Sequence, residues 1–376
     1  MVKKIKQKTK IDRIIIGGYK SISAKYPLSI DLFDVNILLG ANGAGKSNII
    51  SFFRMLGFMM SGTFQKYVAQ HGTNSGILHY GPKATPIMEG HIALSNKFGK
   101  DYYDVKLAPA SGNQLIVSEE KITWEKTDSQ KTPYENTLKS TFLESALVDS
   151  SDSTATVIRK ILSNCKAFQF HDSSQNGALR QASLEGAAHY LQSEGNNLAS
   201  FLLFLRDNYR TSYLRIVEYV KMILPSFGDF YLEPDNGYVR LNWTDNSPND
   251  YVFTSDQFSD GTIRYIALAT LLLQPEETMP DVIIIDEPEL GLHPYAIGQL
   301  AEMIRDASLH AQIIVSTQST LLIDEFPANC ITVVEYNENE GYTTAKRLDE
   351  EQLKDWLKDY SISELWTKNV IGGQPL

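Results

Sequence analysis

A glycine-rich segment at residues 40–47 holds the side chains with the clearest chemical role. Its sequence, Gly-Ala-Asn-Gly-Ala-Gly-Lys-Ser, matches the pattern G-x-x-x-x-G-K-[ST]. In this pattern the glycines let the backbone curl, so that successive N–H groups point at phosphate oxygens. Lys46 would place a compact positive charge on the β- and γ-phosphates of a nucleotide, and the Ser47 hydroxyl would coordinate Mg²⁺. The alternative is a glycine-rich turn that binds nothing.

A second group of reactive side chains follows an apolar run at residues 282–285. Asp286 and Glu287 come directly after Val-Ile-Ile-Ile, the pattern of a buried strand. Asp286 could reach the Mg²⁺ ion, commonly through water, and Glu287 could orient a water for in-line attack on the γ-phosphorus. The alternative is a surface turn that starts with Asp-Glu-Pro. Because the same chain has the glycine-rich segment, the sequence favours the catalytic interpretation.

A third segment, Phe-Ser-Asp-Gly-Thr at residues 258–262, precedes a helical pattern. Ser259 has the residue type of a helix N-cap, and Gly261 permits close approach of the backbone to a phosphate. N–H groups at a helix start form an anion site. Taken alone, the segment predicts only a capped helix. Its position, one helix before the acidic strand, is what makes a role in nucleotide binding worth testing.

The elements that would hold these side chains follow an α/β pattern at both ends of the chain. A continuous apolar run at 35–39 predicts a strand buried on both faces, and apolar residues at helical spacing predict a helix at 47–60. The glycine-rich segment therefore lies between a strand and a helix, as a phosphate loop requires. Further strands are predicted at 11–16, 28–33, 281–286, 312–316 and 331–335, and further helices at 263–273 and 297–308. After Gly17 and Gly18, residues 19–22 are expected to be extended.

The middle of the chain has a different character. Short strands are predicted at 91–94, 103–107 and 115–117, a polar stretch covers 119–139, and helices are predicted at 186–192, 198–207 and 212–224. No heptad pattern is sustained there, so no long coiled coil is expected. We therefore divide the chain into an N-terminal lobe at 1–60, an insertion at 61–250 and a C-terminal lobe at 251–376. The basic residues 1–10 are expected to be a frayed lead.

Together the three segments carry a family resemblance. With Glu-Leu-Gly-Leu-His-Pro at 289–294, which is similar to a D-loop, they resemble the RecF/SMC/Rad50-like ABC ATPases. More closely, the chain resembles the stand-alone AAA_21-type predicted ATPases found in prokaryotic defence systems. The further matches are Tyr19–Ile22, Leu78–Gly81, Gly195–Leu198 and Gly261–Arg264. The resemblance covers both ends of the chain well and the middle only in patches.

The resemblance implies an α/β fold: the head of an ABC-type P-loop ATPase with a mixed or parallel sheet, inserted strands and a compact helical lid. It also implies a homodimer that holds ATP and Mg²⁺ between its subunits. One subunit would bind the nucleotide, and Ser259 and Gly261 of the partner subunit would cap its γ-phosphate. The metal ligands would be Ser47 and Asp286, and the catalytic residues Glu287, Lys46 and Gln318. The nucleotide-binding residues of the first subunit would be Gly40, Asn42, Gly43, Ala44, Gly45, Lys46, Ser47 and Asn48.

Two positions depart from the family pattern or are not fixed by it. Gln318 stands where many relatives have a switch histidine, and an amide carries no proton at neutral pH. Slow turnover, or a role in which ATP occupancy matters more than flux, is one interpretation, and normal turnover with glutamine is the other. Gln169 is a candidate for the loop glutamine that joins the Mg²⁺ shell, and the alternative is a polar residue at a strand edge.

Composition limits the partners and the compartment. The formal net charge is −10, so the chain has no overall basic footprint for nucleic acid, although a local basic groove is compatible with that charge. Two cysteines in 376 residues suggest a reducing compartment. The apolar run after the basic N-terminus is too short for a signal peptide or a membrane span. The cytoplasm is therefore expected.

Four functions remain open. The first is the ATPase sensor or motor subunit of a multi-component system, such as antiviral defence, that acts with a separately encoded effector such as a nuclease. The second is a RecF-like DNA-repair clamp that binds DNA on its own. A transporter ATPase fits the D-loop form and the insertion poorly. A module that only holds nucleotide conflicts with the acidic pair, because Glu287 is present.

Overall fold

The computed structural model describes residues 9–127, 132–139, 142–186, 189–249 and 251–374. The chain forms two compact units: unit 1 comprises Met1–Lys166 and Pro327–Leu376, and unit 2 comprises Ala167–Phe326. These borders differ from the lobes expected from the sequence, because motifs define the lobes whereas packing defines the units. The expected frayed lead lies almost wholly outside the described residues.

Unit 1 contains the strand that leads into the phosphate loop. Strand β3 (Val35–Leu39) is buried along its whole length and pairs in parallel with β16 (Ile331–Asn337). Strand β17 (Tyr342–Arg347) continues this layer antiparallel to β16. Helix α1 (Lys46–Met60) follows the loop, and its apolar side chains at helical spacing are buried. Strand, loop and helix thus follow one another as the sequence predicts.

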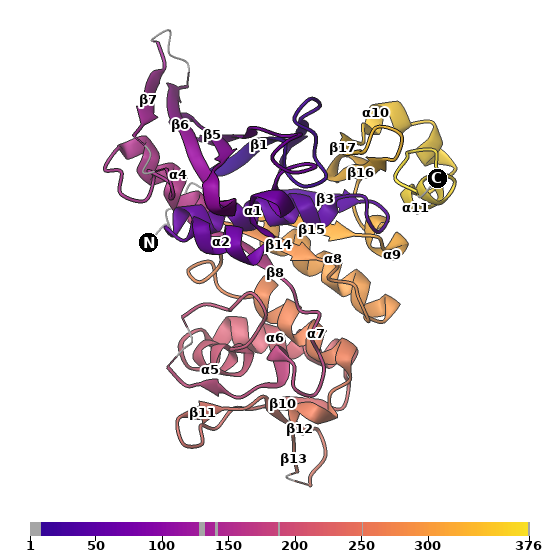
Figure 1. The fold of residues 1–376 in the computed structure, drawn as a ribbon. Coiled ribbons are helices and arrows are strands. Elements are labelled where there is room, and N and C mark those ends of the chain that lie inside the picture. The colour runs from indigo at the N-terminus through magenta and orange to yellow at the C-terminus, as the bar shows by residue number, and fades with distance from the viewer. Residues whose placement is uncertain (1–8, 128–131, 140–141, 187–188, 250, 375–376) are drawn as a thin grey trace. The chain divides into compact units, whose positions relative to one another are not determined.

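A second, antiparallel sheet accounts for most of the remainder of unit 1 (Figure 1). Its strands alternate buried and outward side chains, as expected of a sheet with one packed face. Helix α4 (Ser153–Ser163) packs against α1 and against two of the strands. The strand order is β2 (Leu28–Asp31), β1 (Lys10–Gly17), β4 (Met88–Asn96), β5 (Gly99–Pro109), β6 (Leu115–Lys126), β7 (Tyr134–Leu138). The shorter helices are α2 (Phe64–Gln70), α3 (Thr73–Ile77), α10 (Glu350–Leu353) and α11 (Ile362–Thr367).

Unit 2 contains the acidic strand. Strand β14 (Val282–Asp286) pairs in parallel with β15 (Gln312–Thr317), in a register that sets Asp286 opposite Ser316. Helix α7 (Asp260–Leu272) precedes β14, α8 (Pro294–Ser308) joins β14 to β15, and α9 (Thr320–Ile323) follows β15. Both strands are buried throughout, so their carboxyl ends are held firmly where the polar residues begin.

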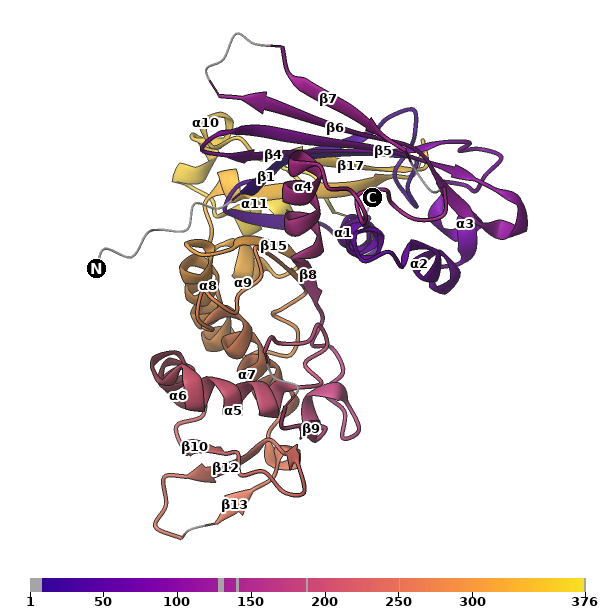
Figure 2. The same ribbon diagram turned by 90° about the vertical axis from the view of Figure 1, so that its left-hand side faces the viewer.

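The rest of unit 2 is a small lid of helices and short strands (Figure 2). Helix α6 (Arg210–Ile223) packs on α5 (Leu198–Asn208) and on α7. A three-stranded sheet has the order β10 (Phe227–Tyr231), β12 (Asn242–Asp245), β13 (Val252–Phe253), and β9 (Ser183–Leu184) pairs with β11 (Tyr238–Val239). The short strand β8 (Cys165–Phe168) leads from unit 1 into unit 2.

The predicted fold class is confirmed: the structure has α/β character with inserted strands and a compact helical lid. Among the described residues the longest helices, α1 and α8, have 15 residues each, so no coiled-coil arm is present there. The strands and helices predicted at both ends appear within a few residues of the expected bounds. The helices α2 and α4 were not predicted, although the buried apolar residues of α4 stand at helical spacing.

Two local predictions are wrong. The described part of residues 186–192 is not helical, because the Asn197 side chain bonds the backbone there: its Nδ2 donates to the Tyr190 carbonyl over 2.8 Å, and its Oδ1 accepts from the Gln192 amide over 2.9 Å. The segment after Gly18 was expected to be extended. Instead the Ile22 amide bonds the Tyr19 carbonyl over 2.7 Å in a turn, with Lys20 at a φ of 48°.

Candidate functional site

The phosphate loop in unit 1 has the features of an anion site. Helix α1 begins after Gly45, which has a φ of 108°, and it has neither a side-chain cap nor an acidic residue in its first turn. Its first N–H groups therefore have no capping side chain as acceptor. The Lys46 ammonium is buried under the loop, where it donates to the carbonyls of Gly40 over 2.6 Å and Ala41 over 3.0 Å. This arrangement fits phosphate oxygens.

Two glycines of the loop lie against neighbouring strands. A Cβ on Gly40 would lie 2.3 Å from the Val334 carbonyl oxygen, and a Cβ on Gly45 would lie 2.3 Å from Thr343 Oγ1. Both strands, β16 and β17, belong to the same layer as β3. The backbone of β16 and the Thr343 side chain on β17 fill the space that a side chain would need, so the curled loop requires glycine at both positions.

A hydrogen-bonded chain that the sequence analysis missed supports the loop from outside. Thr343 Oγ1 donates to the Ala44 carbonyl over 3.0 Å and lies 2.7 Å from Ser21 Oγ. The Asn48 side-chain amide donates to Ser21 Oγ over 2.7 Å. Asn48, predicted to bind nucleotide, thus has a structural partner as well. Ser21 lies in the Tyr-Lys-Ser-Ile segment that contributes to the family resemblance, and this was the one available signal.

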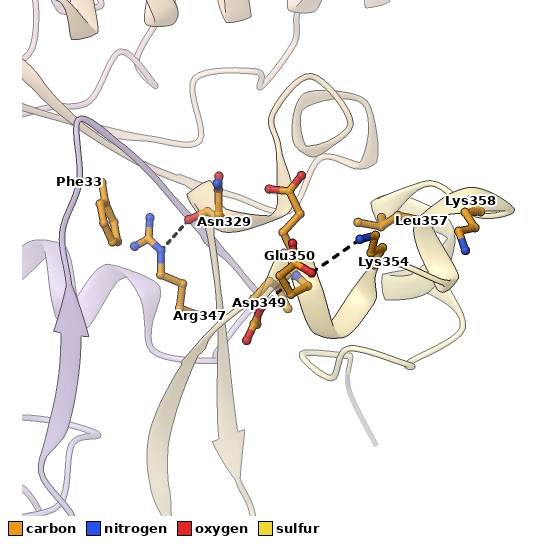
Figure 3. Close-up of a pocket in the computed structure, with 10 residues that line it drawn as sticks. Phe33, Asn329, Arg347, Asp349, Glu350, Lys354, Leu357 and Lys358 are labelled. Carbon is orange, nitrogen blue, oxygen red and sulfur yellow. Dashed lines mark hydrogen bonds and ion pairs between the residues drawn. The ribbon is translucent and has the colours of Figure 1, made fainter.

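Two of the hollows in unit 1 lie at opposite ends of this layer. The smaller, of about 210 Å³, is lined by the loop residues 41–44 together with Glu335, Tyr336, Glu338, Gly373 and Gln374. The larger, of about 940 Å³, is lined by residues that include Phe33, Asn329 and Arg347; Figure 3 shows the Arg347 guanidinium beside the Phe33 ring. Phe33 and Asn329 precede β3 and β16, whereas parallel sheets bind ligands beyond the carboxyl ends of their strands. The larger hollow is therefore not part of the nucleotide site.

The acidic edge in unit 2 is centred on Asp286. Its carboxylate is buried, with 8% of the residue exposed, and it accepts hydrogen bonds from Gln169 Nε2 over 3.0 Å and from the Ser316 hydroxyl. His171 Nε2 lies 3.0 Å from the Asp286 carbonyl oxygen and, in the tautomer with a proton there, donates to it. Gln169 is thus an Asp286 partner, which favours the loop-glutamine interpretation over that of an isolated polar residue at a strand edge.

Glu287 has an unusual backbone conformation. Its φ is 45°, in the left-handed region, which costs a residue with a side chain about 1–2 kcal/mol. Its amide donates to the Ser316 carbonyl over 3.0 Å, and Gln318 Nε2 donates to its carboxylate over 3.3 Å. Strain of this kind is concentrated at functional sites. Unlike Asp286, Glu287 is only half-buried.

The residues at the end of β15 bind the acidic edge one by one. Ser316 binds Asp286, Gln318 binds Glu287, and Thr317 Oγ1 donates to Glu289 over 2.5 Å. Burial raises the pKa of Glu289, and the charge of Glu287 raises it further, against the hydrogen bond from Thr317. The sequence analysis predicted only the Gln318 member of this set, because the pairing depends on the register between two strands.

The Phe-Ser-Asp-Gly-Thr segment at residues 258–262, here called the signature segment, leads into helix α7. Ser259 is its N-cap: the Ser259 hydroxyl accepts from the Thr262 amide over 3.1 Å, and the residue is exposed. Gly261 lies against the D-loop, where a Cβ would be 2.3 Å from the Gly291 carbonyl oxygen. The predicted capped helix is confirmed. Glycine is required at position 261 because the D-loop of the same chain leaves no room for a side chain.

The predicted site residues divide between the units. Residues 40–48 lie in unit 1, and Ser259, Gly261, Asp286, Glu287 and Gln318 lie in unit 2. Among the described residues, no group of three or more His, Cys, Asp or Glu side chains is arranged to hold a metal ion, and no helix is long and apolar enough to cross a membrane. A Mg²⁺ site would therefore need the mixed oxygen donors considered below.

The fold agrees with known structures. The structure aligns with a solved SMC head bound to the C-winged helix domain of ScpA, with a TM-score of 0.55 and 16% identity over 91% of this chain and 99% of that one. An SMC head with an extended coiled coil, bound to the C-terminal domain of ScpA derived from Pyrococcus furiosus, gives a TM-score of 0.56 and 15% identity over 94% and 99%. The fold therefore resembles that of SMC heads.

Sequence comparisons match parts of the chain. Residues 159–324 match the AAA_21 family model, described as "AAA domain, putative AbiEii toxin, Type IV TA system". A putative ABC transporter ATP-binding protein of Geobacter sulfurreducens, GSU1281, is 35% identical over 68 residues. That match spans 18% of this chain and 25% of the relative's length. The family match includes Gln169, the signature segment, the acidic edge and Gln318.

Proposed function

We propose that this chain is an ABC-type ATPase that binds and hydrolyses ATP with Mg²⁺ in a homodimer. The observation that carries the proposal is the acidic edge. Asp286 is held by Gln169 and Ser316, and Glu287 is held beside it by Gln318. The same chain contains a phosphate loop with a buried lysine. Anion site and hydrolytic carboxylate are the two parts that phosphoryl transfer to water needs.

Each part of the nucleotide site has an assigned role. The N–H groups of the loop and Lys46 would hold the β- and γ-phosphates. Ser47, Asp286 and Gln169 offer hydroxyl, carboxylate and amide oxygens, the hard donors that suit Mg²⁺. When bound, Mg²⁺ neutralises charge that develops between the phosphates. The buried Asp286 carboxylate fits this role, because its two oxygens are already fixed by neighbours.

Glu287 would orient the attacking water and accept its proton. Gln318 holds the carboxylate with a neutral amide, which keeps it in place without competing for the proton. Because Gln318 cannot itself carry a proton, proton transfer from the attacking water would depend on Glu287 alone. This supports slow hydrolysis, with the ATP-bound state as the working signal.

A dimer would complete each site. Ser259 is exposed at the start of α7, which suits contact with a γ-phosphate bound by the partner subunit. Because these donors would come from a second subunit, one subunit alone would hydrolyse ATP poorly. ATP would then favour the closed dimer and hydrolysis would release it.

The biological role we propose is the ATP-dependent sensor or motor of a multi-component system in the cytoplasm, such as antiviral defence, with a separate effector. The support is the description of the matching family as a putative toxin of a toxin–antitoxin system. Both cysteines are free thiols, which suits a reducing compartment. The SMC heads of this fold were solved with a protein partner. A DNA-repair clamp is the alternative, and it requires salt-sensitive, ATP-dependent DNA binding by this chain alone.

The test is Glu287→Gln, measured by phosphate release and by mass photometry with and without ATP and DNA. We expect loss of hydrolysis and accumulation of an ATP-dependent dimer. The matched control is Glu276→Gln, since Glu276 is an exposed unit 2 residue whose carboxylate lies 3.6 Å from His310. A Glu287→Gln protein that hydrolyses ATP as the wild type does would refute the catalytic assignment. Tight DNA binding with ATP would favour the clamp.

A further inference from the structure

Arg180 in unit 2 holds the segment that leads into α7, the signature helix. Its side chain is only 6% exposed and follows a short 3₁₀ turn, Ala178–Arg180. Its Nη1 donates to the Ser255 carbonyl, its Nη2 to the Phe258 carbonyl over 3.1 Å, and its Nε to the Ser173 carbonyl over 2.9 Å. A buried charge needs such acceptors, because its desolvation is otherwise costly. A planar guanidinium with fixed donor directions therefore sets the course of residues 255–258.

Packing fixes the same segment. Phe258 is buried, and its ring stacks on that of Trp243 at a centroid distance of 5.0 Å. The side chains of Thr254 and Gln257 close a capping box just before it. Ser259 follows directly, caps α7 and is exposed. These contacts thus leave Ser259 accessible at the end of a firmly held segment.

A fourth bond of Arg180 balances a charge. Asp260 is the acidic residue in the first turn of α7, and its side chain is 65% exposed. Arg180 Nη2 donates to the Asp260 carboxylate over 3.0 Å. An acidic side chain at a helix N-terminus stabilises the helix, but it repels a phosphate that approaches the same end. The guanidinium offsets this repulsion, because the Arg180–Asp260 pair as a whole is neutral.

We infer that Arg180 is a positioning residue for the half-site that α7 offers to a nucleotide held by the partner subunit. Its bonds to the carbonyls of Ser255 and Phe258 fix the backbone that presents Ser259. Its charge neutralises Asp260, so that the helix end accepts a γ-phosphate. This inference rests on the proposed ATP-dependent dimer. It adds that the charge balance of one ion pair sets how tightly the dimer closes on ATP.

The experiment changes each member of the pair separately. Asp260→Asn keeps the shape and an oxygen acceptor for Arg180 but removes the negative charge. Arg180→Lys keeps the positive charge but replaces the fork with a single ammonium, which cannot bond all three carbonyls in the same geometry. The matched controls are Arg215→Lys and Asp306→Asn, because these two residues form another Arg–Asp pair of unit 2, over 2.7 Å.

Dimerisation of the full chains is measured by sedimentation velocity with Mg²⁺ and the non-hydrolysable analogue AMP-PNP, at low and at high salt. Calorimetry at protein concentrations below those of dimerisation gives the affinity of one subunit for AMP-PNP. Melting temperatures are recorded alongside. If Arg180 and Asp260 only stabilise the fold, both changes weaken the dimer. If they balance charge at the half-site, the two changes act in opposite directions.

We expect the AMP-PNP-dependent dimer of Asp260→Asn to be about two- to fivefold tighter than that of the wild type at low salt, the usual effect of one charge near a helix N-terminus. Screening should narrow this difference at high salt. The Arg180→Lys dimer should be about tenfold weaker, in line with the loss of a hydrogen bond from a charged group. Single-subunit affinity should stay within about twofold throughout, because the phosphate loop belongs to unit 1. The control pair should match the wild type.

The Asp260→Asn result decides the inference, even if Arg180→Lys does not fold. An Asp260→Asn dimer that is unchanged or weaker than the wild type would overturn it. So would a dimer of folded Arg180→Lys as tight as that of the wild type, or equal shifts in the control pair. A wild-type chain that binds AMP-PNP and does not dimerise would instead refute the proposed function, so the two failures are distinguishable.

Discussion

Gly261→Ala tests the contact between the signature helix and the D-loop most directly. Gly261 is the second residue of α7 and has a helical backbone, so alanine creates no conformational strain there. The new Cβ, however, would lie 2.3 Å from the Gly291 carbonyl oxygen, whereas an ordinary contact is 3.4 Å or more. One of the two segments must retreat by about 1 Å, well beyond what close-packed structure absorbs freely.

The size of the effect follows from two opposing terms. Alanine in place of glycine favours a helix by up to about 1 kcal/mol. Forcing an extra methyl into a packed contact costs about 1–3 kcal/mol. The 2.3 Å approach places the steric cost in the upper part of that range, about 2–3 kcal/mol, so the net loss of stability is about 1–2 kcal/mol. For a domain of this size, this lowers the melting temperature by roughly 2–8 °C.

The assay compares Gly261→Ala with Gly298→Ala by differential scanning calorimetry, ATP hydrolysis and ATP-dependent dimerisation. Gly298 lies in α8 of the same unit, and the nearest atom to its added Cβ is Glu325 Oε1 at 3.8 Å. This control should be neutral or slightly stabilising. Gly261→Ala should melt lower, bind ATP normally and lose hydrolysis, because the retreat displaces Ser259 or the D-loop.

One result would refute the reasoning outright. If Gly261→Ala and Gly298→Ala share the same melting temperature and the same turnover, then Gly261 and Gly291 do not hold each other in place. A loss of stability with full activity would be equally informative. It would show that the contact stabilises the fold but is not needed for catalysis.

Two further predictions concern unit 1. Burial raises the pKa of Asp101 to about 6 from its ordinary value near 3.8, so the unfolded chain loses this proton near pH 4 and the folded chain near pH 6. The free-energy cost of burying the ionised Asp101 carboxylate therefore grows between these pH values and reaches its full size above them. Asp101→Asn should raise the melting temperature relative to wild type more at pH 7.5 than at pH 4.5, and a constant difference between the two pH values would contradict this. Thr343→Val removes the hydroxyl that donates to the Ala44 carbonyl over 3.0 Å, and it should weaken ATP binding, measured by calorimetry, about two- to tenfold. The control is Thr344→Val at the neighbouring, exposed position. Equal ATP affinities of the two variants would show that the loop does not need this support.

Local pattern determined the phosphate loop and its flanking elements. The apolar run at 35–39 forms a strand with these bounds, and the predicted helix at 47–60 starts one residue earlier than expected. This agreement has a physical cause: burial on both faces, the helical period and the need for glycine are all properties of neighbouring residues. The same holds for Ser259, whose type and place before a helical pattern predict the cap that the structure shows.

Local pattern failed where hydrogen bonds between residues a few positions apart hold the backbone in a turn. The region around residues 186–192 has a helical spacing of apolar residues, yet the amide of Asn197 binds its backbone in a turn instead. The turn after Gly18 likewise contradicts the β-propensity of its residues. In each case a hydrogen bond between residues a few positions apart outweighs a weak propensity for helix or strand.

Tertiary structure alone decided how the acidic edge is assembled. The sequence places Asp286, Glu287 and Gln318 among the site residues, but it does not pair Ser316 with Asp286 or Thr317 with Glu289. Those pairs follow from the parallel register that sets Asp286 opposite Ser316. Gln169 and Arg264 reach the same edge from a loop and a helix that only folding brings near. Residue type and local order thus determine which chemistry is available, whereas register and packing decide which side chains perform it together.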